Sequence, residues 1–194
     1  MESALYQTIV NVAVATLFTI AFTLVSLRRN TKGDAGWFAV SYGTGILTPV
    51  SELLVWLTPY PAVFTATSFA SFSLAFNFMA KGLSVYYKQP VSNWLLIASF
   101  VLSLIVRGAI WGGARNTMPY ELLYQLPFAV AMDLCAMIIA SSRSNGGLEH
   151  ILTGLFGALA ASFIVKSVVA IWLKIPGPPP HNTWTANTRC SRSP

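Results

Sequence analysis

The chain has 194 residues, of which 55% are hydrophobic and only 9% charged. A soluble domain carries roughly 25% charged residues, so the composition excludes a soluble globule and predicts a polytopic membrane protein. The net charge of +6 is spread over single residues and pairs between apolar runs. We therefore interpret the positive charge as a topology signal and predict no nucleic-acid partner.

Six apolar runs follow one another along the chain, each near the length of about 20 residues that a helix needs to cross a bilayer. They cover approximately residues 4–27, 36–57, 61–86, 94–111, 120–140 and 151–173. The runs are too long for the strands of a transmembrane barrel, and they show no alternation of apolar and polar residues. The fold class is therefore predicted to be all-α, a polytopic transmembrane helix bundle with six spans in a domain over residues 1–174. The lipid bilayer is its expected partner.

Basic residues mark the odd-numbered loops between these runs. Arg28 and Arg29 follow the first run, Lys88 follows the third, and Arg143 follows the fifth. Loops rich in arginine and lysine stay on the cytoplasmic side of a membrane. We therefore expect a multi-pass protein whose odd-numbered loops are cytoplasmic and whose N-terminus lies outside.

The chain changes character after the sixth run. Residues 175–194 are rich in proline and polar residues and show no periodicity. Such a composition is typical of a disordered terminus. The abruptness of the change favours a second interpretation, in which this tail is a frameshifted or artificial end. The intact protein would then be longer and would carry a seventh span.

Two stretches resemble a known family. The Arg28-Arg29 pair followed by GWFAVSYGTGILTPVSELL (residues 36–54), and then FMAKGLSVYY (residues 78–87), are similar to the N-terminal multi-pass membrane region of bacterial GGDEF-type diguanylate cyclases. The resemblance implies a sensory input module in the bacterial inner membrane, truncated or frameshifted before the catalytic domain that makes cyclic di-GMP from GTP. It implies signalling through a shift in helix packing, within a homodimer. It carries no catalytic residue, because Leu148 in the sequence GGLEH stands where the cyclase signature has an acidic residue.

Four ionisable residues fall inside the predicted spans, where charge is costly and marks either function or a need for a partner. They are Glu52 in the second run, Arg107 in the fourth, Asp133 in the fifth and Lys166 in the sixth. Under the predicted topology, Glu52, Arg107 and Lys166 lie toward the outer side, and Asp133 lies nearer the middle or the inner side. We predict an outward-opening polar pocket that binds a small anionic ligand, with Arg107 as a bidentate donor and Lys166 as a point charge.

Simpler roles for these residues stay open. Glu52 would lock the bundle if it neutralised Lys166 or Arg107, and Arg107 could instead extend to the membrane interface from its place near a span end. Asp133 would line a proton or ion path if Cys135, Gln125 and Asn77 lay beside it, although a hydrogen bond to a neighbouring helix is the commoner role.

A small membrane transporter or channel subunit is the alternative function. The sequence predicts no catalytic, metal or cofactor site, because it contains none of the motifs that carry such chemistry.

Overall fold

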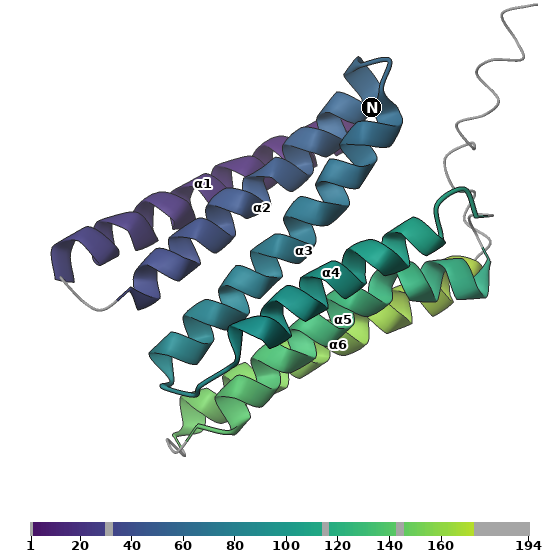
Figure 1. Cartoon of the computed structure of the whole chain (residues 1–194). Helices are drawn as coiled ribbons and strands as arrows, with labels where there is room; N and C mark the ends of the chain where they lie inside the picture. Colours follow the sequence, from purple (N-terminus) through teal and green to yellow (C-terminus); the bar gives the residue numbers. More distant parts are fainter. Residues whose placement is uncertain (1, 30–32, 114–116, 143–145, 173–194) are drawn as a thin grey trace, which may run out of the picture.

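A computed structural model of the chain describes residues 2–29, 33–113, 117–142 and 146–172 (Figure 1). Within these ranges the chain forms helices and contains no strand. The helices are α1 (Glu2–Arg29), α2 (Asp34–Leu57), α3 (Pro61–Tyr86), α4 (Asn93–Ala109), α5 (Met118–Ala140) and α6 (Gly147–Trp172). The all-α prediction is confirmed. The tail beyond the sixth run and the loop residue Arg143 lie outside the described residues.

Five of the helices are long and apolar enough to cross a membrane. The exception is α4, which is apolar but has 17 residues. At about 1.5 Å per residue it covers roughly 25 Å of a hydrocarbon layer of roughly 30 Å. A short span is accommodated by local thinning of the bilayer or by long side chains at its ends. We therefore describe the chain as a multi-pass membrane protein in which the predicted fourth span is the shortest.

The distribution of side chains is the reverse of that in a soluble bundle. Large aliphatic residues lie on the outside, as shown by Leu17 and Leu102, which are 67% and 60% exposed. Many buried polar residues are serines: Ser41, Ser51, Ser68, Ser71, Ser73, Ser84, Ser103, Ser142 and Ser167. Lipid solvates aliphatic side chains, whereas small hydroxyl residues allow helices to approach closely and hydrogen-bond. The pattern is the one expected for a bundle surrounded by lipid.

The helices form two layers of three (Figure 1). In the N-terminal layer, α2 packs against both α1 and α3, and in the C-terminal layer α5 packs against α6 and α4. Each helix runs opposite to the one before it, so the α1–α2, α3–α4 and α5–α6 connections share one end of the bundle. A hydrogen bond of 2.9 Å from Gln89 Nε2, in the α3–α4 connection, to the carbonyl oxygen of Ser141 after α5 ties two of these connections together.

Helix α3 joins the two layers. One apolar cluster contains Ala80 and Leu83 of α3 with Cys135 and Ile139 of α5. A second cluster brings the α3 rings of Phe69 and Phe76 against Phe128 and Met132 of α5. Two hydrogen bonds then connect α3 to α4, through the pairs Ser73–Ser103 and Asn77–Ser99. The layers therefore meet along α3, while α1 and α6 lie at the edges of the bundle.

Candidate functional site

A cavity of about 540 Å³ lies between the two layers. We call it the inter-layer cavity. Residues of α1, α2 and α3 line it on one side, and residues of α5 and α6 line it on the other. Its volume falls within the range of roughly 300 to 1,000 Å³ that small-molecule sites occupy. Its polar lining residues are Asn11, Ser41, Tyr42, Thr48, Glu52, Ser68, Tyr124, Gln125 and Lys166.

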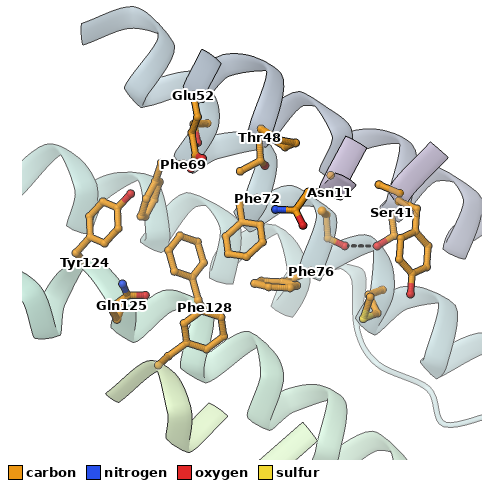
Figure 2. Close-up of a pocket in the computed structure, with 18 of the residues that line it drawn as sticks. Asn11, Ser41, Thr48, Glu52, Phe69, Phe72, Phe76, Tyr124, Gln125 and Phe128 are labelled. Atoms are coloured by element: carbon orange, nitrogen blue, oxygen red, sulfur yellow. Dashed lines mark hydrogen bonds between the residues drawn. The ribbon is translucent and has the colours of Figure 1, made fainter. Parts of the chain in front are cut away.

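Phenylalanine rings form the apolar part of this lining. They come from α3, α5 and α6, and Phe128 of α5 stands at their centre. The ring centroid of Phe128 lies 5.0 Å from that of Phe69, 4.9 Å from Phe72 and 5.9 Å from Phe163. Figure 2 shows Glu52 and Thr48 on one side, Tyr124, Gln125 and Phe128 on the other, and the Phe72 and Phe76 rings between them. Offset and edge-to-face aromatic contacts of this kind are favourable, so the apolar wall is well packed.

Helix packing and lipid contact are the simplest roles that the sequence predicts for the phenylalanines of α3, Phe64, Phe69, Phe72, Phe76 and Phe78. Phe69 and Phe76 are 1% and 7% exposed, so for these two rings the packing interpretation is confirmed. The same two rings also line the inter-layer cavity. Their position on the cavity wall is what the sequence interpretation missed.

Polar contacts hold α2 against α3 along the cavity. The Ser41 hydroxyl donates to the carbonyl oxygen of Ala75 over 2.7 Å (Figure 2), and the hydroxyls of Thr48 and Ser71 lie 3.0 Å apart. Residues 41, 48 and 52 fall on one face of α2, because these spacings are close to whole numbers of helical turns. The face that packs on α3 is therefore also the face that brings Glu52 to the cavity.

Glu52 keeps most of its hydrogen-bonding capacity free. Its one contact in the described structure is with the Ser68 hydroxyl, which lies 3.5 Å from Glu52 Oε1. That distance is at the outer limit for a hydrogen bond. The side chain is exposed, so the cavity is open where the carboxylate lies.

Lys166 lines the same cavity from the opposite layer. Within the described ranges its ammonium makes no hydrogen bond and has no carboxylate within 4.0 Å, and the residue is exposed. The next residue, Ser167, donates a hydrogen bond of 3.2 Å to the carbonyl oxygen of Glu121. This bond places Lys166 beside the first turns of α5. The Glu52–Lys166 lock considered from the sequence is thus not formed in this arrangement.

Arg107 lies in the last turn of α4 and is only 7% exposed. Its guanidinium carbon is 4.8 Å from the ring centroid of Trp111, 5.7 Å from that of Tyr124 and 5.9 Å from that of Phe69. The Nε atom is buried and has no hydrogen-bond partner in the described structure. Because Tyr124 and Phe69 also line the cavity, Arg107 stands directly behind the cavity wall. Cation–π contacts with these rings stabilise the charge by about 0.5–2 kcal/mol each.

Asp133 does not belong to this arrangement. It lies on α5, is exposed and is not among the residues that line the cavity. Asn77 is buried and bonded, with its Nδ2 donating to the Ser73 carbonyl oxygen and its Oδ1 accepting from Ser99. Of the residues considered for a proton path, only Gln125 reaches the cavity. The structure brings Glu52 and Lys166 to one cavity, puts Arg107 behind its wall and leaves Asp133 on the outer face of α5.

Sequence reasoning overlooked two contributors to the cavity. Neither Tyr124 of α5 nor Asn11 of α1 was singled out from the sequence. An asparagine in an otherwise apolar first span is a signal that could have been noticed, because a polar residue in lipid requires a partner or a cavity. Tyr124 gives no such signal, since tyrosine is common near span ends.

Comparison with protein-family models, curated proteins and solved structures gives no match for this chain. The chemistry of the cavity is therefore inferred from its own lining. Among the described residues, no group of three or more His, Cys, Asp or Glu side chains could hold a metal ion. Glu52 is the one carboxylate in the lining, and its neighbours there are hydroxyls, amides, rings and one ammonium. Such a lining is suited to binding a polar organic molecule.

Proposed function

We propose that this chain is a sensory input module of a cyclic di-GMP signalling protein, embedded in the bacterial inner membrane and regulated by a small ligand with an acidic group. The observation that carries the ligand-binding part of the proposal is the pair of unpaired opposite charges, Glu52 and Lys166, on facing walls of the inter-layer cavity. The signalling part rests on the sequence resemblance of residues 36–54 and 78–87. Ionisable groups inside a membrane protein persist where they pair with each other or serve a ligand. These two do not pair with each other, so we infer that they bind a ligand.

The direction in which the cavity opens follows from the distribution of charge. Arg28 and Lys88 belong to the end of the bundle where the odd-numbered connections meet, and both are exposed. By the positive-inside rule this end is assigned to the cytoplasm. Glu52 and Lys166 lie toward the C-terminal ends of α2 and α6, which are at the opposite end. A ligand therefore reaches the cavity from outside, as the sensing of an external signal requires.

The signal would arise from the position of the cavity between two layers. A ligand that contacts both layers binds best when they are at one particular spacing, and so shifts the population toward that spacing. The shift would pass along the helices to the cytoplasmic side, within the expected homodimer. The sequences that resemble the cyclase input region, residues 36–54 and 78–87, belong to α2 and to the end of α3, the pair of helices that holds Glu52.

The binding step is tested with the purified full chain in detergent. Thermal unfolding is followed while a panel of carboxylates, phosphates and amino acids is added, because a ligand of the folded state raises the unfolding temperature. Glu52→Gln and Lys166→Met should unfold within about 0.5 kcal/mol of the wild type, since exposed unpaired charges contribute little stability. Lys166→Met should also lose the shift produced by an acidic ligand.

The opposite result would contradict the ligand-binding part of the proposal. If both variants lost stability equally and no compound raised the unfolding temperature of the wild type, Glu52 and Lys166 would act as a structural lock. The signalling part is tested separately by reading the coding DNA downstream in all three frames. A frame that encodes a GGDEF domain supports it, and an intact stop codon without such a frame contradicts it.

One observation favours a transporter as the second candidate. The cavity lies between two layers that meet chiefly along α3, and such a joint would allow the layers to rock about a central site. Uptake of a binding compound into proteoliposomes separates the two functions. A transporter moves the compound across the bilayer, whereas a sensory module only binds it.

A further inference from the structure

We infer that the ligand of the inter-layer cavity is a zwitterion with an apolar side group, of the chemical class of an aromatic or large aliphatic amino acid. This inference rests on the proposed binding function and narrows it from an acidic ligand to one that carries an ammonium as well.

The first step is the charge of the lining. Lys166 attracts an acidic group, but Glu52 lines the same cavity and repels one. A simple anion would therefore neutralise Lys166 and leave Glu52 without a partner and facing a like charge. A molecule with both a carboxylate and an ammonium gives each of these two side chains a partner of opposite charge.

The second step is the position of the acidic and the basic side chains, which lie in different layers. Glu52 belongs to the N-terminal layer and is next to Ser68 of α3. Both cations belong to the C-terminal layer and lie beside the first turns of α5. The bond from Ser167 to Glu121 places Lys166 there, and the contact with Tyr124 places Arg107 there. The ligand carboxylate accordingly faces α5 and α6, and its ammonium faces α2.

The buried Arg107 adds to the positive potential on the α5 side of the cavity. Arg107 is 7% exposed and its Nε atom is unpartnered. Rings screen a charge much less than water does, so the field of a buried guanidinium extends further. It reaches the cavity through Tyr124 and Phe69, the two lining rings that it contacts. Arg107 is thus a positioning residue that makes the α5 side of the cavity favourable for a carboxylate.

The third step is the apolar wall. The rings of Phe72 and Phe76 lie tilted to each other with centroids 4.4 Å apart, and the Phe163 ring of α6 has its centroid 6.4 and 6.3 Å from theirs. All three line the cavity. Aromatic walls with a few polar groups are the usual lining of small-molecule sites. Such walls favour a ligand whose side group is a ring or a branched aliphatic chain over one whose side group is a hydrogen atom or carries a second charge.

A zwitterion in this orientation connects the two layers through its own charges. Its ammonium contacts α2 and its carboxylate contacts α6, so it draws the layers together at the cavity. An anion bound to Lys166 alone would contact a single layer. The chemistry of the ligand therefore also explains how binding could change the spacing between the layers.

The experiment compares four small probes on the purified full chain in detergent. They are the free amino acid phenylalanine, 3-phenylpropionate, which lacks its ammonium, phenethylamine, which lacks its carboxylate, and glycine, which lacks its ring. The readout is the concentration of each probe that gives half of the maximal rise in unfolding temperature. We expect phenylalanine to act at concentrations roughly 10-fold lower than each of the other three, which corresponds to the loss of one contact.

Two matched variants assign the contacts. In Glu52→Gln, phenylalanine should lose its advantage over 3-phenylpropionate and keep its advantage over phenethylamine. In Lys166→Met, the opposite should hold. The comparison among probes on the wild-type chain is decisive even if one variant fails to fold.

The inference is overturned if 3-phenylpropionate binds the wild type as well as phenylalanine does. That result would leave the proposed binding of an acidic ligand standing. It is also overturned if none of the four probes shifts the unfolding temperature. In that case the binding of an acidic ligand is tested separately, by the wider panel of carboxylates, phosphates and amino acids.

Discussion

The helix contacts within the N-terminal layer differ in chemistry from those within the C-terminal layer. In the N-terminal layer, α2 and α3 meet through polar contacts, of which Ser41 with the Ala75 carbonyl and Thr48 with Ser71 are the clearest. In the C-terminal layer, α5 and α6 meet largely through apolar and aromatic packing, with Phe128 against Phe163 at its centre. Lipid competes for apolar surface but offers no hydrogen bonds. Polar contacts therefore specify one register between two helices, whereas apolar packing depends on how well shapes fit.

The layers also differ in the placement of their acidic residues. Glu52 of the N-terminal layer lines the inter-layer cavity, whereas Asp133 of the C-terminal layer lies exposed on α5. Both are single carboxylates within long apolar runs. The difference shows that the face of the helix on which a carboxylate lies decides whether it reaches the cavity.

Asp133 offers the sharpest test of this difference. Replacing Asp133 with Leu should improve the apparent free energy of insertion of the fifth span by about 3 kcal/mol, because a lipid-facing carboxylate is costly near the middle of a helix. A glycosylation-mapped insertion assay measures it. Asp133→Asn is the matched control and should fall between the two. If Asp133→Leu instead abolished a stable dimer, a second copy of the chain would be what covers this face.

Phe128→Ala tests the apolar joint between the layers. The side chain is 3% exposed and packs on rings of α3 and α6. Its removal should lower the free energy of unfolding in detergent by about 2 kcal/mol, because packing contacts are lost and a void is left, whereas transfer of the side chain from water does not contribute. Leu155→Ala is the control, since Leu155 is 53% exposed on α6. Equal effects of the two changes would contradict the role of Phe128 as the centre of packing.

Ser41→Ala tests the polar joint of the N-terminal layer and should have the smallest effect. Loss of one hydrogen bond between helices in a membrane protein costs about 0.6 kcal/mol on average. Ser162→Ala is the control, because the Ser162 hydroxyl bonds only to the Leu159 carbonyl of its own helix. Thermal unfolding of both variants measures the difference. A Ser41 variant no less stable than the Ser162 variant would show that α2 and α3 also rely mainly on apolar packing.

Much of the fold could be predicted from the sequence. A backbone surrounded by hydrocarbon must satisfy its own hydrogen bonds, so long apolar runs become helices. The expected start of the third run at residue 61 agrees with the first residue of α3, Pro61. The fourth run was predicted to continue to residue 111, but α4 ends at Ala109, and Ile110 and Trp111 form a turn. Hydropathy does not reveal where α4 ends, because the turn residues that follow it are themselves apolar.

The candidate site could be predicted only as a set of residues. Glu52, Arg107, Asp133 and Lys166 stand out because charge is rare in apolar runs. Their faces could not be assigned, because an almost uniformly apolar helix has little amphipathic pattern from which to read an inner side. The rings around Arg107 come from α3, from the turn after α4 and from α5. Only Trp111, four residues after Arg107, could be paired with it from local spacing, because the contacts with Phe69 and Tyr124 depend on how the helices pack.

The sequence by itself thus determined that the chain is helical, that it crosses a membrane several times and that four charges must find places within it. These features follow from the solvent, since lipid dictates helix formation and makes each charge conspicuous. Only the tertiary structure decided that Glu52 and Lys166 share a cavity, that Arg107 lies behind its wall and that Asp133 faces outward. The rotation of each helix about its own axis settles these placements, and that rotation is set by contacts between helices such as Ser41 with Ala75 and Phe128 with Phe69.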